Sequence, residues 1–173
     1  MLEHTRTLPS GTITRWSLAG LMATAAVAFG APVAHAELLT FGTNTAPAFF
    51  GFAVAPVDIN GGIAGNTLTF GNCVAGTPVM ITYSAECSHS GTVAQWGTIQ
   101  ILLNGVALSP TAGGDDAFCS GNETAGVHDG WATHSMEVVG RCAAGANVVA
   151  VTARSVFAGP TLRLDDMSTV VDR

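Results

Sequence analysis

The sequence predicts an all-β protein, a two-sheet antiparallel sandwich of jelly-roll type with about eight or nine strands. Several runs alternate apolar with polar residues and are rich in β-branched side chains, which is the pattern of half-buried strands. No window after residue 36 combines a 3.6-residue apolar period with a helix cap. An immunoglobulin-like sandwich would satisfy the same pattern and is the alternative architecture.

The first 36 residues have the pattern of an export signal. Arg6 and Arg15 supply positive charge, an apolar run rich in Ala and Leu follows, and Ala-His-Ala at 34–36 is a small-x-small cleavage site. The apolar run is shorter than a membrane span. We therefore expect a cleaved N-terminal signal helix at 1–36 and a single secreted, extracellular β-sandwich domain at 37–173. An ordinary N-terminal helix or an uncleaved anchor is the alternative.

Five strands are predicted before residue 104. In the fourth, Val79, Ile81 and Tyr83 fall on one face while Met80 and Thr82 fall on the other, so the strand is expected to bury one side. Turn residues bound each run. The five runs cover residues 38–41, 48–54, 67–70, 78–86 and 95–103.

The dipeptide Asn104-Gly105 predicts a β-hairpin, because a type I′ turn needs two residues that tolerate positive φ. Its second strand is expected at 106–108. The following segment, 109–130, is rich in Gly, Asp, Ser and Thr and is too long for an ordinary connection, which is typical of a functional loop. The remaining strands are predicted at 131–139, 147–156 and 161–171.

Four cysteines lie after residue 36, and in an exported domain an even number favours disulfides. Cys73 and Cys142 each begin the form Cys-x-Ala-Gly-x-x-Val, so each precedes a tight turn that leads into a strand. If those strands are neighbours, Cys73 pairs with Cys142 and Cys87 pairs with Cys119, which would anchor the long loop. Sequence alone leaves all three pairings open.

The charge of residues 37–173 restricts the partners. They contain four arginines, no lysine and eleven acids, a formal charge of −7. Nucleic acids and anionic membranes both require a basic surface, so neither is an expected partner. No apolar run after residue 36 reaches the length of a membrane span. Low charge with many apolar β-rich runs is compatible with a homo-oligomer.

The last predicted strand carries a resemblance to a known group of proteins. Its sequence Leu-Arg-Leu-Asp-Asp-Met-Ser, residues 162–168, resembles the Leu/Ile-Asp-Asp-x-Ser pattern of secreted bacterial jelly-roll modules, namely carbohydrate-binding modules and their galactose-binding-like relatives. The resemblance implies a structural calcium ion near Asp165 and Asp166. From the residues alone, one of these acids must face inward and meet a metal, Arg154 or Arg163, unless the strand bulges.

Candidate ligand-binding residues gather around two tryptophans. Trp131 follows His128 and Asp129, so an aromatic face would lie beside polar groups at the start of a strand. Sugar rings stack on such faces while the polar neighbours bind hydroxyls. Trp96 occupies a similar position after a turn. The alternative for Trp131 is that it covers the end of the hydrophobic core.

These observations lead to three functional hypotheses. The first is a secreted, non-catalytic binding or adhesion module that recognises a glycan or another extracellular polymer through residues 109–131. The second is a structural or self-assembling extracellular protein. The third is a small hydrolase that uses His89, His128 or His134, but the sequence has no Gly-x-Ser-x-Gly or His-Glu-x-x-His motif, so we expect no enzyme activity.

Overall fold

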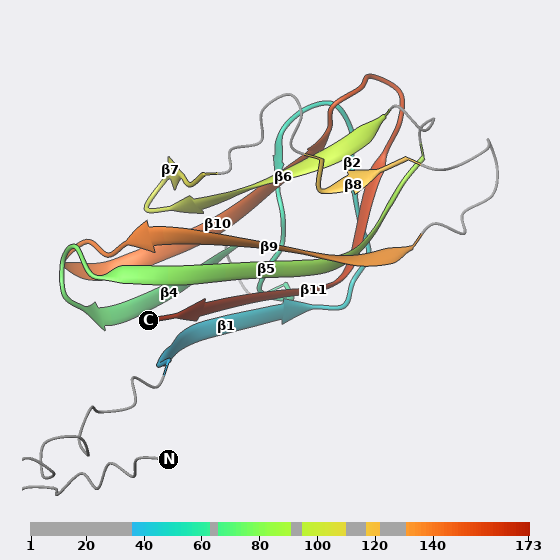
Figure 1. Ribbon diagram of the computed structural model, residues 1–173. Helices are drawn as coiled ribbons and strands as arrows, with labels where there is room; N and C mark the ends of the chain where they lie inside the picture. Colours follow the sequence, from blue (N-terminus) through green and yellow to red (C-terminus); the bar gives the residue numbers. More distant parts are fainter. Residues whose placement is uncertain (1–35, 63–65, 91–94, 110–116, 122–130) are drawn as a thin grey trace, which may run out of the picture. The chain divides into compact units, whose positions relative to one another are not determined.

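The computed structural model is all-β across the residues it describes, which form two antiparallel sheets (Figure 1). The described ranges are 36–62, 66–90, 95–109, 117–121 and 131–173. The expected signal helix therefore lies outside the described residues. No helix in the described ranges is long and apolar enough to cross a membrane.

The first sheet contains five strands. They are β1 (Leu38–Asn44), β2 (Ala48–Phe50), β5 (Pro78–His89), β9 (Ala132–Arg141) and β11 (Leu162–Asp172). Its order is β1-β11-β5-β9, with β2 also paired to β11. One edge of this sheet is therefore formed by β1 and β2, which pair with successive parts of β11, and the other by β9.

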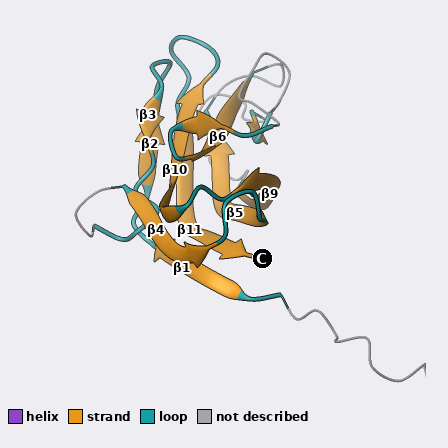
Figure 2. Cartoon of the chain, turned by 90° about the vertical axis from the view of Figure 1, so that its left-hand side faces the viewer, coloured by secondary structure: helices purple, strands orange, loops and turns teal. Residues whose placement is uncertain are grey.

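The second sheet contains six strands and forms the other layer of the sandwich (Figure 2). They are β3 (Ala55–Pro56), β4 (Thr67–Cys73), β6 (Trp96–Leu103), β7 (Val106–Ala107), β8 (Cys119–Ser120) and β10 (Gly145–Ser155). Its order is β3-β10-β6-β7, with β4 paired to β10 and β8 paired to β6.

The strand pairings are nested in the manner of a jelly roll. Strand β1 pairs with β11, β4 with β10, β5 with β9, and β6 with β7, so successive strands from the start of the chain pair with successive strands from its end. This long folded hairpin is wrapped into two layers by the pairings of β11 with β5 and of β10 with β6. The predicted fold class is thereby confirmed.

The predicted strand count and one predicted strand need correction. The described residues form eleven strands rather than eight or nine, because two short strands of two residues each, β3 and β8, lie outside every predicted run. Of the predicted run 48–54, only 48–50 is a strand, β2 of the first sheet, and β3 of the second sheet begins just after the run, at residue 55. Between them the chain crosses from one layer to the other, and it leaves Phe52 and Val54 exposed.

The predicted hairpin at Asn104-Gly105 is confirmed. Asn104 has φ 53° and Gly105 has φ 78°, as a turn with two left-handed residues requires, and β6 pairs with β7 across them. The side chain of Asn104 also binds the neighbouring strand, because its Oδ1 accepts from the backbone N–H of Val148 at 2.8 Å. The turn is therefore tied to β10 as well as to its own hairpin.

The hydrophobic core lies between the sheets and follows the alternation of the sequence. In β5 the predicted face of Val79, Ile81 and Tyr83 is almost completely buried. Strands β6, β10 and β11 contribute alternate residues in the same way. The largest fully buried side chains include Tyr83, Ile59, Ile81, Ile99, Ile101, Leu162, Leu164 and Met167.

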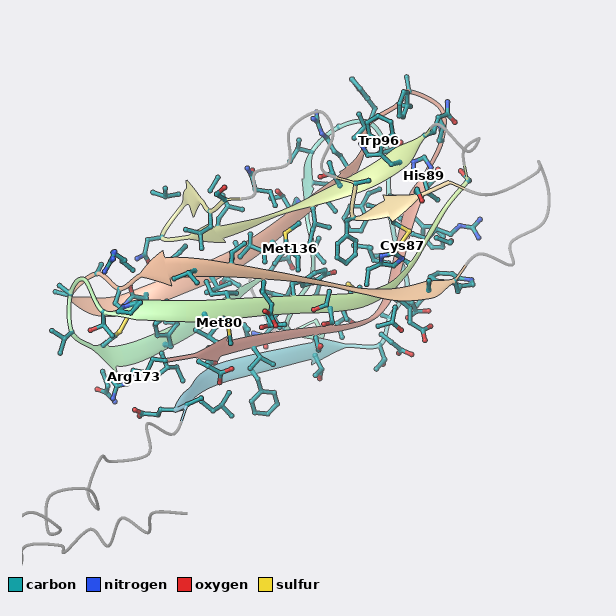
Figure 3. The ribbon with its side chains drawn as sticks, viewed as in Figure 1. Met80, Cys87, His89, Trp96, Met136 and Arg173 are labelled. Atoms are coloured by element: carbon teal, nitrogen blue, oxygen red, sulfur yellow. A yellow bond between two sulfur atoms is a disulfide. The ribbon has the colours of Figure 1, made fainter. Side chains whose placement is uncertain are left out.

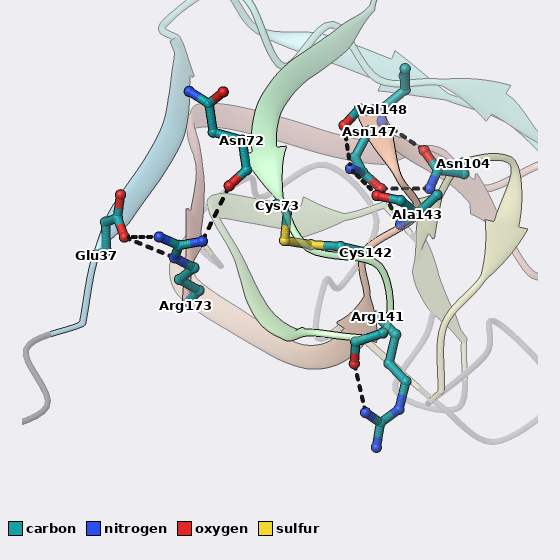
Figure 4. Close-up of a disulfide and its surroundings, with 12 residues drawn as sticks. Glu37, Asn72, Cys73, Asn104, Arg141, Cys142, Ala143, Asn147, Val148 and Arg173 are labelled. Carbon is teal, nitrogen blue, oxygen red and sulfur yellow. Dashed lines mark hydrogen bonds and ion pairs between the residues drawn. A yellow bond between two sulfur atoms is a disulfide. The ribbon is translucent and has the colours of Figure 1, made fainter.

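The structure contains two disulfides, with the pairing that the repeated form Cys-x-Ala-Gly-x-x-Val favours. Cys73 of β4 is bonded to Cys142, which follows β9, with their Cα atoms 6.0 Å apart (Figure 4). Cys87 of β5 is bonded to Cys119 of β8, with a Cα separation of 6.2 Å. The Cys87–Cys119 bond therefore links the two sheets, and the Cys73–Cys142 bond links β4 of the second sheet to the connection between β9 and β10. Two disulfides are consistent with an extracellular protein.

Candidate functional site

A pocket of about 220 Å³ opens on the outer face of the second sheet. Its polar side chains come from two adjacent strands, β6 and β10, in register: Gln100 lies opposite Thr152, and Thr98 lies opposite Arg154. The residues that line it are Val54, Thr98, Gln100, Thr152, Ala153 and Arg154.

The alternation of β6 and β10 explains why polar groups meet there. Ile99 and Ile101 of β6 and Val151 of β10 fill the core, so the residues between them point away from it. Val54, from the crossover between β2 and β3, adds an apolar wall. The pocket is therefore a polar floor made by two paired strands, with one apolar side.

Arg154 is the charged group of this pocket. It is half-buried, and its Nε is buried without a hydrogen-bond partner among the described residues. The other described arginines are engaged: Arg173 binds Glu37, Arg141 donates to the carbonyl of Gly76 and Arg163 lies over the ring of Phe49. Among the described arginines, Arg154 is the one that lines this pocket, and its buried Nε is a donor available to a ligand there.

Trp96, a predicted ligand-binding residue, lies on the same face of β6 as the pocket. It is two residues before Thr98, half-buried, and packs edge-on against Phe157 with ring centroids 4.9 Å apart. Its Nε1 is buried and has no partner among the described residues. Trp96 does not line the pocket itself, but it lies further along the same strand face.

The structure separates Trp131 from this pocket. Trp131 is 38% exposed and directly precedes β9, so it belongs to the edge of the first sheet. His128 and Asp129, predicted to lie beside it, are outside the described residues, as is most of the segment 109–131. A ligand site around Trp131 stays a prediction.

The Asp165-Asp166 pair lies at a bulge in β11, so neither acid enters the core. The register shifts between Asp165 and Ser168, and Asp166 is exposed with φ 43°. Asp165 is half-buried, and its Oδ1 accepts from the backbone N–H of Asp166 at 2.9 Å. The extra residue lets Leu164 and Met167 both face inward. A calcium ion at these acids stays a prediction.

The described residues contain one cluster with three potential metal ligands, Cys87, Cys119 and His134, whose ligand atoms lie within 4.8 Å of one another. Here the two sulfurs are bonded to each other, and the His134 ring packs near Phe118 with centroids 5.8 Å apart. In the oxidised protein this cluster is therefore a crosslink covered by an imidazole.

His89, a residue of the hydrolase hypothesis, is buried between the sheets. Its Nε2 lies 3.0 Å from the Oγ of Ser155, which donates to the carbonyl of Phe157 at 2.9 Å. Both His89 and Ser155 are almost fully buried. The pair therefore links β5 of the first sheet to β10 of the second, and the Ser155 hydroxyl faces the interior of the sandwich rather than its surface.

The sequence predicts a ligand site in residues 109–131 and does not predict this pocket. The available signal was the alternate polar positions Thr98, Gln100, Thr152 and Arg154 in two apolar strands. Those positions become a site only when β6 and β10 are adjacent and in register. No protein-family model matches the chain, and no curated protein matches it either.

Proposed function

We propose that this protein is a secreted, non-catalytic binding module that holds a glycan or another extracellular polymer against the outer face of its second sheet. The observation that carries the proposal is the pocket, where hydroxyl, amide and guanidinium groups converge on an open sheet face. Ligand sites commonly combine an apolar wall with a few placed polar groups, and Val54 supplies that wall here.

Secretion is part of the proposal and has separate support. The first 36 residues have the charge, apolar run and cleavage pattern of a signal peptide. All four cysteines are paired in disulfides, which persist in oxidising compartments. Intact mass of the exported protein, with and without a reductant, tests both points: a chain starting at residue 37 with no free thiol is the expected result.

The binding function is tested with a panel of soluble neutral and acidic polysaccharides in affinity electrophoresis. We expect at least one of them to retard the full chain, expressed for export, and Gln100→Ala to reduce that retardation. The matched control is Ser84→Ala in the first sheet, where Ser84 donates to Ser135 on the adjacent strand at 3.0 Å. A panel without any binder, or equal loss in both variants, would refute a site on the second sheet.

A second candidate function is self-assembly through the outer face of the first sheet. Leu38, Met80 and Val139 are 55%, 40% and 66% exposed, and with Asp172 they form one row across the four main strands. Phe41, 62% exposed, lies on the same edge strand as Leu38. Exposed apolar rows of this kind mark interaction surfaces or association hazards.

Sedimentation over a range of protein concentrations tests this candidate. Self-assembly predicts a mass that rises with concentration and a smaller rise in Val139→Lys. The control is Val148→Lys on β10 of the second sheet, where the side chain is 37% exposed. A constant monomer mass at all concentrations would exclude assembly.

A further inference from the structure

We propose that the pocket on the second sheet selects an acidic ligand, a uronic acid residue of a polysaccharide whose carboxylate is bound by the guanidinium of Arg154. The proposal rests on the binding function above and names its substrate class. It makes Arg154 the residue that determines specificity, while Gln100 and Thr152 bind hydroxyl groups of the same sugar.

The state of Arg154 is the first reason. A guanidinium that is half-buried has lost part of its hydration, and this loss is unfavourable unless an anion or acceptors replace the water. Its Nε finds no acceptor among the described residues, and no acid lines the pocket. Arginine binds carboxylates through two parallel hydrogen bonds, so a planar carboxylate is the natural complement.

The distribution of charge between the two sheets is the second reason. Arg154 is the single charged side chain in the described strands of the second sheet, since the other strands there carry no Asp, Glu, Lys or Arg. The strands of the first sheet carry five acids and two arginines, so their charges are mostly negative. The whole chain has a formal charge of −6, so an acidic polymer would be repelled by the first sheet and accepted at the second.

The size of the pocket and its neutral groups are the third reason. Its volume of about 220 Å³ is below the roughly 300 to 1,000 Å³ of pockets that enclose a drug-sized ligand. It therefore suits one ring of a polymer whose neighbours continue along the open sheet face, where Trp96 lies. Gln100 and Thr152, opposite each other, offer an amide and a hydroxyl beside the guanidinium. A uronic acid presents a carboxylate and hydroxyls on one ring.

The experiment uses polygalacturonate, its fully methyl-esterified form and dextran sulfate, with affinities measured by calorimetry on the full exported chain. The ester keeps the sugar rings and removes the charge. We expect polygalacturonate to bind about ten to a hundred times more tightly than its ester, the range of a charge-assisted hydrogen-bonded pair. Arg154→Gln should remove most of this difference.

Two further variants make the outcome specific. Arg141→Gln removes a positive charge from the first sheet, where Arg141 binds the carbonyl of Gly76, and should leave the preference for polygalacturonate unchanged. Arg154→Lys keeps the charge without the planar fork and should retain only part of the preference. Thermal unfolding of each variant checks that it is folded. If Arg154→Gln does not fold, Arg154→Lys takes its place as the test of the carboxylate preference.

The outcomes separate this proposal from the proposed function. Equal binding of the acid and ester forms, with no effect of the Arg154 variants, would overturn the acidic specificity and leave a neutral glycan-binding module. Dextran sulfate that binds as tightly as polygalacturonate, with the same dependence on Arg154, would overturn the assignment to a carboxylate. No binding of any polysaccharide in either panel would reject the binding function itself.

Discussion

The two ends of the sandwich are each crosslinked by a disulfide but differ in how they satisfy buried polar groups. At the Cys73–Cys142 end, the buried Asn147 side chain is fully bonded (Figure 4). Its Nδ2 donates to the carbonyls of Ala143 and Gly145, and its Oδ1 accepts from the backbone N–H of Ala143 and from Asn104. Arg173 and Glu37 close the same end with an ion pair.

The opposite end, where Figure 3 shows Cys87, His89 and Trp96 together, leaves polar atoms unpaired. Among the described residues, the Nε1 of Trp96 and the Oη of Tyr83, whose ring packs against Phe118 beside Cys119, have no hydrogen-bond partner. Each such group costs stability. The difference indicates that the first end is built for stability, while the second keeps donors that the fold itself does not use.

Removing the crosslinks should give the largest effects. The chain-entropy account predicts a loss of about 4 kcal/mol for Cys73→Ala/Cys142→Ala and slightly less for Cys87→Ala/Cys119→Ala, because the bonds close spans of 69 and 32 residues. Double variants leave no free thiol. Urea unfolding of both, compared with the parent, measures the two losses.

This result would break the comparison in one specific way. If the Cys87–Cys119 bond contributes more than the Cys73–Cys142 bond, then the second end is the one that holds the fold together. The reason would be that this bond also holds β8 and the buried ring of Phe118 in place, a contribution that the chain-entropy account, which depends only on the length of the span, leaves out.

Much of this fold follows from alternation that can be read in the sequence. The runs at 78–86, 95–103, 147–156 and 161–171 are strands because one set of alternate residues is apolar and the other polar. The Cys73–Cys142 pairing is also the one that the sequence favours, but it forms for a different reason: the strands that follow the two cysteines, β5 and β10, lie in different sheets. The cysteines meet because β4, which ends at Cys73, pairs with β10.

The candidate site could not be derived in the same way. Thr98 and Arg154 are 56 positions apart in sequence numbering and meet only through the register of β6 against β10, which no local pattern specifies. The Asp165-Asp166 pair shows a related limit. The sequence shows that two successive acids in an apolar strand would place one of them in the core. The bulge that keeps both out of the core, however, depends on the pairing of β11 with β5.

Loss of the Asn147 side chain should give the second largest effect. Asn147→Ala removes four hydrogen bonds at a fully buried position and leaves backbone groups of Ala143 and Gly145 without partners. We expect a loss of about 3 kcal/mol in the free energy of unfolding. Val148→Ala, at the partly exposed next residue, is the control and should change stability by less than about 0.5 kcal/mol. Similar losses in both variants would contradict the structural role of Asn147.

The smallest expected effect has the opposite sign and comes from Tyr83 at the second end. Tyr83 is fully buried, and its Oη has no partner among the described residues. Tyr83→Phe deletes the unpaired hydroxyl and keeps the ring against Phe118, so we expect the free energy of unfolding to rise by about 1 kcal/mol. A loss of stability would mean that the hydroxyl is hydrogen-bonded and that the two ends do not differ as described.

The same residue supplies a pH dependence. Burial raises the pKa of Tyr83 far above its ordinary value of 10.0, so the folded state keeps the phenol neutral where the unfolded state releases its proton. Below pH 10 the phenol is protonated in both states, so Tyr83 does not change how the free energy of unfolding varies with pH. Above pH 10 the free energy of unfolding falls as pH rises.

The chain has a single tyrosine, so near-ultraviolet absorbance of phenolate reports Tyr83 alone. The parent protein should show phenolate only as it unfolds, and Tyr83→Phe should lose this part of the alkaline destabilisation. A phenolate signal near pH 10 in the folded protein would place the Tyr83 hydroxyl in contact with water and remove it from the unpaired groups of the second end.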